Sequence, residues 1–496
     1  MSINYLDLSK EDLEIIFKDI RFRTKPNRHQ YITLLWGLEK NRIAINHGIG
    51  TGKTLNSLYM HQLWKTKKVL VVCPNGVVNS WVKQITLHTK SPLYVLKGTA
   101  IQRKKILETG EEGFYIINYE GLKPLFMEKF EDRNGKVKTV IDTESIKQAN
   151  FDGLIIDESH NCKNKAAIQS QLCAAVSGFC QKVIIMTGTP VCNNEMDLWS
   201  QYYVLDNGAT LGDNYWYFLN NYFYKKPWDK FNWYIKPSSQ RKILEKIKDV
   251  TIRFSREECL DLPEIVYQLI NVDITPEQTR FLSDVLSELK TEIQSDIFKT
   301  SIKGSSEEST VTMLTKTSKL VQIPSGFCYD KNGEVVKIKS NKLNELEELL
   351  LQIERKVIIW HEFNEEADMI NALCKKLKIK CVEMSGRVND KQKKHNIELF
   401  IKNDEYKVLI AHPKTAGTGL DGLQDVCDVM VFFTNGWSSV AREQCIGRIS
   451  RQGQKNRVLI VDLVVKDTIE EKKMGVLEHK EDLRNTILEY IKNYKK

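Results

Sequence analysis

The sequence predicts an α/β protein with two parallel-sheet domains in tandem and a mostly helical insertion between them. Two series of short, apolar, β-rich runs alternate with helical stretches, and strands covered by helices on both faces of a parallel sheet are apolar throughout. The residues between the two series have a helical pattern and many aromatic side chains. We expect a first domain over residues 1–200, an insertion and linker over 201–340, and a second domain over 341–496 that ends in a short helix.

The predicted strands are the β-rich runs themselves. In the first series they cover residues 42–45, 69–72, 114–117, 154–156 and 183–186, and in the second 357–360, 381–384, 408–411, 429–433 and 458–461. Two Asn-Gly pairs, at 134–135 and 332–333, lie between strand-like flanks and predict β-hairpins. The polar stretch 303–309 has no periodicity and predicts a loop.

The composition excludes several classes of protein. No apolar run approaches the roughly 18–20 residues that span a bilayer, so we expect no membrane contact, and the polar, acidic N-terminus is unlike a secretory signal. The 11 cysteines are scattered without a C-x-x-C pair, which argues against a zinc module and a disulfide framework. We therefore expect an intracellular protein, cytoplasmic or nucleoid-associated. The net charge of +9 is compatible with a polyanionic partner.

Two segments of the first domain predict nucleotide hydrolysis. The segment GIGTGKT at residues 48–54 follows a predicted strand and precedes a predicted helix, and its glycines let backbone amides approach phosphate oxygens closely. His47 stands where the general pattern of this loop has glycine. A later apolar strand ends on Asp157 and Glu158. A loop hydroxyl and an aspartate can bind Mg²⁺, and a glutamate can orient the attacking water, so we expect ATP and Mg²⁺ as cofactors.

A pair of arginines in the second domain would complete such a site. Arg448 and Arg451 lie three residues apart in QCIGRISRQGQ, residues 444–454, and we expect them on one face of a helix. An ATPase divided between two domains needs a cation that reaches the terminal phosphate only when the domains close, and arginine suits this role. An isolated pair of this kind would instead indicate a solvated basic face, but the phosphate loop and the acid pair favour the catalytic role.

The chain resembles the Swi/Snf-type DNA translocase branch of superfamily two helicases, relatives of the DEAD/DEAH-type motors, over residues 26–470. The matching segments are VLVVCPNGVVNSW (69–81), DESHNCKN (157–164), MTGTPVCNNEMDLWS (186–200) and the run 444–454. The resemblance implies two RecA-like domains and DNA-dependent ATP hydrolysis. Residues 414–421 resemble the family's RAGGLGLN segment with departures: Thr415 and Ala416 replace alanine and glycine, and Asp421 replaces asparagine.

The resemblance also implies a role for each matching residue. Gln30 would read adenine, Lys53 would bind phosphates and Glu158 would polarise water. The residues implied to bind ATP are Gln30, Gly50, Thr51, Gly52, Lys53, Thr54, Asp157, Gln444, Arg448 and Arg451, with Thr54 and Asp157 as Mg²⁺ ligands. Those implied to act in catalysis are Lys53, Asp157, Glu158, Arg448 and Arg451. The turn beginning at Thr187 would couple the nucleotide to the DNA track.

Loops at the ends of the predicted strands are the expected contacts with DNA phosphates. The candidates are Pro74, Asn75, Asn118, Thr187, Ser385, Gly386, Lys414 and Thr415. Each could be an ordinary loop residue, and their shared position at strand ends is the argument. The aromatic run 215–234 is either the core of the insertion or a wedge that stacks on bases. We expect the core, with Trp228 and Trp233 as exceptions because lysines flank them.

These expectations combine into an ATP-dependent motor that moves along or remodels duplex DNA. The alternative is a helicase that remodels forks or junctions by separating or reannealing strands. An RNA helicase fits less well because the matching segments belong to the DNA branch, and a degenerate scaffold does not fit because all five catalytic residues are present. Only about 25 residues precede and follow the resemblance, so we expect duplex or forked DNA as the partner. A nuclease or a replication or recombination factor is an expected protein partner, and a restriction or defence motor subunit a further alternative.

Overall fold

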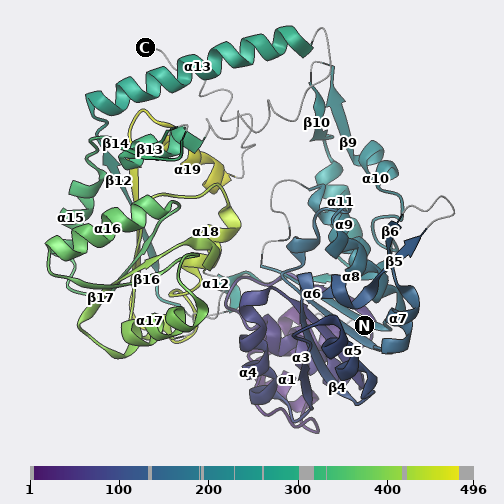
Figure 1. Cartoon of the computed structure of the whole chain (residues 1–496). Helices are drawn as coiled ribbons and strands as arrows, with labels where there is room; N and C mark the ends of the chain where they lie inside the picture. The colour runs from purple at the N-terminus through teal and green to yellow at the C-terminus, as the bar shows by residue number, and fades with distance from the viewer. Residues whose placement is uncertain are drawn as a thin grey trace. The chain divides into compact units, whose positions relative to one another are not determined.

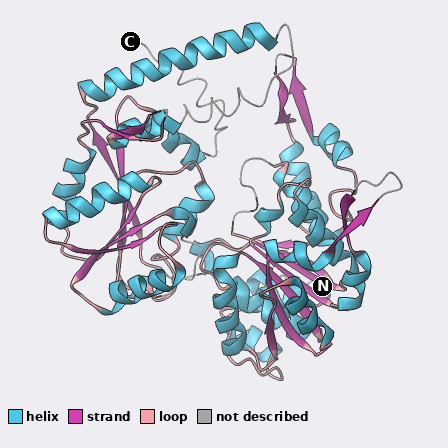
Figure 2. Ribbon diagram, viewed as in Figure 1, coloured by secondary structure: helices cyan, strands magenta, loops and turns pink. Residues whose placement is uncertain are grey.

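Two parallel β-sheets organise the chain, one in each of the two units Met1–Asp261 and Leu262–Lys496 of this computed structural model (Figures 1 and 2). The structure describes residues 5–131, 137–188, 190, 195–227, 229–259, 262–300, 318–330, 332–415 and 422–479. The first sheet has the order β11-β1-β8-β7-β2-β4-β3, and all its strand pairs are parallel. Its strands are β1 (Arg42–Ile45), β2 (Lys68–Cys73), β3 (Leu93–Val95), β4 (Gly113–Asn118), β7 (Gly153–Asp157), β8 (Lys182–Met186) and β11 (Thr251–Ile252).

Helices cover both faces of the first sheet. Alternate strand residues divide between two buried clusters: Ile43 and Ile45 belong to one, and Ala44 belongs to the other. The first cluster includes α1 (Lys10–Ile16), α2 (Arg28–Gly37), α3 (Lys53–Leu63) and α4 (Val78–His88). The second includes α6 (Tyr119–Phe126), α7 (Thr143–Ala149), α8 (Ile168–Phe179) and α9 (Asp197–Asp206). Because side chains alternate along a strand, an apolar strand fills both clusters.

The second sheet repeats this arrangement in the order β12-β19-β18-β15-β17-β16, again with parallel pairs. The strands are β12 (Ile265–Val272), β15 (Val357–Trp360), β16 (Lys380–Met384), β17 (Tyr406–Ala411), β18 (Val429–Phe432) and β19 (Val458–Val465). One face packs on α15 (Lys342–Gln352) and α16 (Asn364–Lys376), and the other on α17 (Asp390–Lys402) and α18 (Ser439–Ile446). All ten predicted strands are confirmed, and so is the prediction of two parallel-sheet domains.

Three strands of the two parallel sheets were not predicted: β3, β11 and β12. The first two contain three and two residues, too few to show a pattern. β12 is an edge strand whose residues are mostly exposed, so it lacks the apolar continuity of the central strands. Both predicted hairpins are confirmed, because β5 (Met127–Glu131) pairs antiparallel with β6 (Val137–Ile141), and β13 (Phe327–Tyr329) with β14 (Val335–Lys337). Among the described residues, no helix has the length and hydropathy needed to cross a membrane.

The predicted insertion, residues 201–340, contains the division between the units at 261/262. Its domain boundaries at 200 and 340 stay a prediction. It contains helices as expected, but also the antiparallel hairpin of β9 (Phe223–Lys226) and β10 (Asp229–Ile235). Its further helices are α10 (Tyr215–Tyr222), α11 (Ser239–Ile247), α12 (Arg256–Cys259) and α13 (Pro276–Thr300). The predicted loop 303–309 lies outside the described residues.

The aromatic run in this region is only partly a core. Phe218 and Phe223 are buried as expected, whereas Trp216 and Tyr217 are 60% and 69% exposed. Trp233, a predicted exception, is half-buried and packs against the core of the first unit. Trp228, the other predicted exception, lies outside the described residues.

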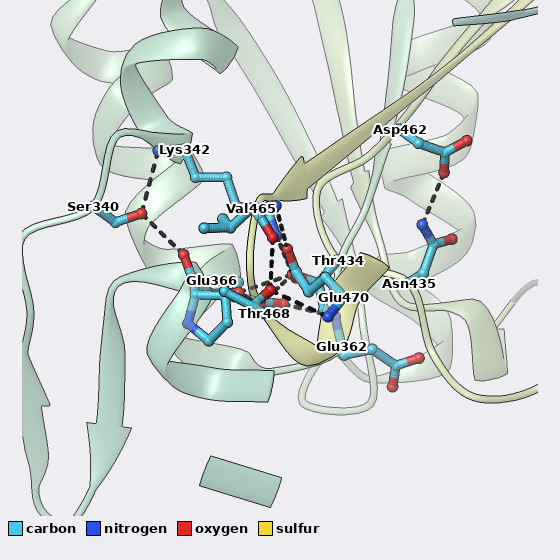
Figure 3. A network of polar contacts seen from close by, with 12 residues as sticks. Ser340, Lys342, Glu362, Glu366, Thr434, Asn435, Asp462, Val465, Thr468 and Glu470 are labelled. Carbon is cyan, nitrogen blue, oxygen red and sulfur yellow. Dashed lines mark hydrogen bonds and ion pairs between the residues drawn. The ribbon is translucent and has the colours of Figure 1, made fainter. Parts of the chain in front are cut away.

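A buried ion pair joins helix α19 (Ile469–His479) to the first residue of α15 in the second unit (Figure 3). The ammonium of Lys342 lies 2.6 Å from Glu470 Oε1, and both side chains are at most 5% exposed. The other carboxylate oxygen of Glu470 accepts a hydrogen bond from the amide of Val465 at 3.0 Å. Thr434 Oγ1 lies 3.4 Å from the same ammonium and donates to Glu366 Oε1 at 2.7 Å. The network therefore joins the start of α15, the start of α16, the end of β18 and α19.

We expect Lys342→Met to lower the free energy of unfolding of the second unit by about 3–5 kcal/mol, because it leaves the Glu470 carboxylate buried without a cation. Urea unfolding followed by circular dichroism measures this loss. The double variant Lys342→Met/Glu470→Leu should recover most of it. Lys376→Met is the matched control, since its exposed ammonium pairs with Glu347 at 2.7 Å, and should cost at most about 1 kcal/mol. Equal losses for the two single variants would contradict the role of the buried pair.

Candidate active site

The loop between β1 and α3 has the backbone that a phosphate-binding loop needs. Gly50 and Gly52 both have φ of +82°, a left-handed conformation that favours glycine. A Cβ on Gly52 would lie 2.4 Å from the side-chain nitrogen Nε2 of Gln30, so any side chain there would require Gln30 to move. Helix α3 begins at Lys53, and the first N–H groups of a helix have no partner within it. The loop therefore presents backbone donors and the positive end of a helix dipole, a combination suited to phosphate.

Helix α2 holds this loop from one side. Gln30 Nε2 donates to the carbonyls of Thr51 at 3.2 Å and Gly52 at 3.4 Å. His29 Nε2 lies 2.8 Å from the same Thr51 carbonyl. Burial lowers the pKa of His29, so its ring is neutral at pH 7 and Nε2 carries the donated proton. Gln30 thus lies against the phosphate loop, and its reading of adenine stays a prediction.

His47, the departure from the glycine pattern, fastens the loop to the end of the first unit's sheet. Its Nδ1 accepts a hydrogen bond from the amide of Phe254 at 3.2 Å, and its Nε2 lies 2.9 Å from Thr33 Oγ1. The amide of Gly48 donates to the Phe254 carbonyl at 2.9 Å. Burial, with a smaller contribution from the charge of Lys53, holds the pKa of His47 well below 6.5. The ring is therefore neutral, as an acceptor at Nδ1 requires.

Lys53 lies over the loop and near both acids. Its ammonium donates to the carbonyls of His47 at 3.0 Å and Gly48 at 3.1 Å. Burial lowers the pKa of Lys53, and the negative charges of Glu158 and Asp157 offset part of that effect. The side chain is therefore within electrostatic range of the acid pair that ends β7.

The environment of Asp157 makes its carboxyl group harder to ionise. Burial, followed by the adjacent charge of Glu158, raises the pKa of Asp157 to about 7, although Trp81 and Lys53 act in the opposite direction. Trp81 Nε1 donates to Asp157 Oδ2 at 2.8 Å, and the Tyr119 hydroxyl donates to the Asp157 carbonyl at 2.7 Å. Neither contact was predicted. Trp81 does end the matching segment 69–81, but only the fold shows that it contacts the acid pair.

Glu158 is held in its ionised form by two neighbours. Burial alone would raise its pKa, but hydrogen bonding and charge from His160, together with Lys53 and Thr187, lower the pKa of Glu158 overall. His160 Nδ1 lies 3.2 Å from Glu158 Oε2, and Thr187 Oγ1 donates to that oxygen at 3.3 Å. Thr187 is wholly buried, so the structure places its hydroxyl on Glu158, and its contact with DNA stays a prediction. His160 was not predicted.

The residues expected from the second domain lie around the end of α18. Gln444 is in this helix, but the helix ends at Ile446, and Arg448 and Arg451 follow it in a turn. The prediction that both arginines share a helix face is therefore wrong. Gln454 anchors the turn, because its buried Nε2 donates to the carbonyls of Cys427 at 3.0 Å and Ile449 at 3.2 Å. The approach of the arginines to a nucleotide stays a prediction.

The predicted DNA-contacting residues lie at the carboxyl ends of the parallel strands, as expected, but they differ in exposure. Asn75, Gly386 and Lys414 are exposed, and Pro74 and Asn118 are half-buried. Ser385 and Thr415 are buried: Ser385 Oγ donates to Glu383 at 2.5 Å, and Thr415 Oγ1 to the Met384 carbonyl at 3.1 Å. Residues 416–421 and Thr189 lie outside the described residues. The exposed members are therefore the stronger candidates for phosphate contacts.

Comparison with known proteins identifies the family of this chain. The chain matches the model of the SNF2-related domain over residues 29–325 and that of the helicase conserved C-terminal domain over residues 341–453. It is 25% identical to putative protein p41 of Acyrthosiphon pisum secondary endosymbiont phage 1, covering 95% of this chain and 99% of that protein. It is also 25% identical to the uncharacterized ATP-dependent helicase MG018 of Mycoplasma genitalium, covering 90% of this chain but 40% of that protein.

A solved structure, the Sulfolobus solfataricus SWI2/SNF2 ATPase core in complex with dsDNA, aligns with 93% of this chain and 92% of its own length, at 20% identity and a TM-score of 0.41. The SNF2-related model alone spans more than half of the 496 residues. The chain therefore belongs to the SNF2-related family of helicase-type ATPases.

Proposed function

We propose that this protein is an ATP-dependent motor that moves along duplex DNA. The observation that carries the proposal is the meeting of the phosphate loop and the acid pair at one edge of the first sheet. There, Lys53 lies within electrostatic range of Asp157 and Glu158, whose pKa values shift in opposite directions. Membership of the SNF2-related family supports ATP hydrolysis coupled to DNA.

The residues of this edge fit Mg-ATP. The left-handed glycines of the loop and the backbone N–H groups at the start of α3 suit a phosphate. Burial and the charge of Glu158 raise the pKa of Asp157, and a divalent cation beside its carboxylate would favour the ionised form. Thr54, at the start of α3, and Asp157 would hold Mg²⁺, which supplies charge neutralisation for the transferred phosphoryl group.

The remaining residues would perform the hydrolytic step. Lys53 would release its two loop carbonyls and bind the β- and γ-phosphates. Glu158, held ionised by its neighbours, would orient a water and accept its proton. Arg448 and Arg451, with Gln444 nearby, would approach from the second unit when DNA favours closure. DNA would contact the exposed strand-end residues Asn75, Gly386 and Lys414 through its phosphates. A nuclease or a replication or recombination factor is the protein partner we propose, in an intracellular setting.

The test is the rate of ATP hydrolysis with duplex DNA, single-stranded DNA, forked DNA and RNA. A translocase should be stimulated most by duplex DNA and should displace a triplex-forming strand without unwinding the duplex. Preferential stimulation by forks, with regression of a model fork, would instead support the alternative of a fork- or junction-remodelling helicase. Stimulation by RNA alone would contradict both.

Lys53→Ala should reduce ATP hydrolysis below about a tenth of the normal rate, because the phosphates lose their cation. DNA binding should persist, since the strand-end loops are unchanged. Steady-state phosphate release and DNA gel shift measure the two effects. Lys402→Ala is the control, because Lys402 is an exposed residue of α17 in the second unit, and it should retain the full rate. A higher residual rate for Lys53→Ala would show that this loop does not hold the phosphates.

Glu158→Gln should bind ATP and release it slowly, because the water loses its base while Asp157 remains to hold Mg²⁺. Filter binding of labelled ATP followed by a chase measures the lifetime of the complex. His160→Gln should have a milder effect, since it removes one neighbour that keeps Glu158 ionised. An ATP complex of Glu158→Gln that lasts no longer than that of the wild type would assign Glu158 another role.

Arg451→Ala should leave nucleotide affinity nearly unchanged but lower the DNA-stimulated rate by roughly a thousandfold, the size typical of a trans-acting arginine. The first unit alone contains Lys53, Thr54 and Asp157, so ATP binding does not require Arg451. Turnover with and without duplex DNA, beside nucleotide affinity, measures both properties. Arg457→Ala is the matched control, because Arg457 is 78% exposed and lies 3.7 Å from Glu264. Full stimulation of Arg451→Ala by DNA would contradict the proposed completion of the site.

A further inference from the structure

The segment from α10 to the residue after α11 concentrates charge and aromatic side chains. Residues 215–248 contain eight lysines and arginines and two acids, a net charge of +6, whereas the whole chain has +9. The basic residues are Lys225, Lys226, Lys230, Lys236, Arg241, Lys242, Lys246 and Lys248, and the acids are Asp229 and Glu245. Such a local excess of positive charge attracts a polyanion.

The β9–β10 hairpin divides its aromatic residues between two faces. In Figure 1 the hairpin extends beyond α10 and α11 of the first unit. On one face, Phe223 is buried and Trp233 packs against the same core, so this face attaches the hairpin to the first unit. Tyr224 pairs with Tyr234 on the other face, with ring centroids 5.9 Å apart. The ammonium of Lys226 lies 4.0 Å from the Tyr234 ring centroid. We call Tyr224, Lys226 and Tyr234 the hairpin outer face.

Exposed aromatic side chains are concentrated in α10 and the following strand β9. Of the described residues, the exposed aromatics are Tyr5, Phe179, Trp216, Tyr217, Tyr224 and Tyr267, so three of the six lie within residues 216–224. A single exposed ring is ordinary, whereas a group of them indicates an interaction surface. The Lys165 ammonium lies 4.2 Å from the Tyr215 ring and 5.4 Å from the Trp216 ring. Because Lys165 follows Glu158 by seven positions, α10 contacts the segment that leaves the acid pair.

The chemistry of this surface fits a nucleic-acid strand whose bases are unpaired. Aromatic rings stack on bases of any sequence, and neighbouring lysines bind the phosphates between them. A duplex keeps its base faces covered, so it would use the lysines but not the rings. We propose that the hairpin outer face binds an unpaired DNA strand through stacking on Tyr224 and Tyr234 and through the charge of Lys226. The inference rests on the proposed function in one respect, namely that the nucleic acid bound is DNA.

The test compares the affinities of the full-length protein for a labelled oligothymidylate, a blunt duplex and a fork with unpaired arms, by fluorescence anisotropy. Tyr224→Leu should weaken oligothymidylate binding about tenfold and fork binding in the same direction, because one stacking contact is lost. Affinity for the blunt duplex and basal ATP hydrolysis should not change. Tyr224→Phe keeps the ring and should bind as the wild type does.

Lys226→Glu should weaken oligothymidylate binding and reduce the salt dependence of that binding. The exposed control Lys402→Glu makes the same change of charge and should do neither.

Each result bears on the inference separately from the proposed function. If Tyr224→Leu weakens duplex and oligothymidylate binding equally, the proposal that bases stack on Tyr224 is wrong. If it weakens neither, the hairpin outer face does not bind DNA, and a protein partner becomes the better explanation of its exposed rings. Failure of Tyr224→Phe to restore binding would also overturn stacking. If duplex DNA fails to stimulate ATP hydrolysis while the Tyr224 variants behave as expected, the motor proposal fails and the strand-binding face stands.

Discussion

The direction of the strands is the constraint on which the rest of this structure depends. In each of the two large sheets every pair is parallel, so all the strands of such a sheet end at one edge. In the first unit, the phosphate loop follows β1 at that edge, the acid pair lies at the end of β7, and Thr187 follows β8. These segments are far apart in sequence, and no local interaction would bring them together. The apolar clusters on both faces of the sheet fix the strands, and the strands place the polar residues.

The acid pair shows how the surroundings give two adjacent carboxylates different properties. Two neighbouring buried charges of the same sign repel, so one of them is held closer to its neutral form. Both acids are buried and near Lys53, but the side chain of Asp157 accepts from a tryptophan, whereas that of Glu158 has a histidine and a threonine as neighbours. The pKa of Asp157 is therefore raised and that of Glu158 lowered. The two adjacent acids therefore differ in how readily each takes up a proton.

Much of the fold could be predicted from the sequence, because a buried parallel strand has an apolar pattern with few alternatives. The ten central strands and both Asn-Gly hairpins have such local signals. The exposed edge strand β12 has no such signal. The arginine pair was placed on a helix because its spacing fits one, but the helix ends at Ile446. Trp81 contacts Asp157, which lies 76 positions later in the sequence, so no local motif contains both residues. His160 contacts Glu158, two positions earlier, and both belong to one short motif.

The hydrogen bonds beside β1 also have a mechanical consequence. Val250, Ile252 and Phe254 accept in turn from the amides of Ala44, Asn46 and Gly48, so the ladder continues from the sheet into the phosphate loop. The segment that follows β11 is therefore hydrogen-bonded to the loop itself. Movement of the loop would strain these hydrogen bonds and displace the residues that follow β11 in the first unit.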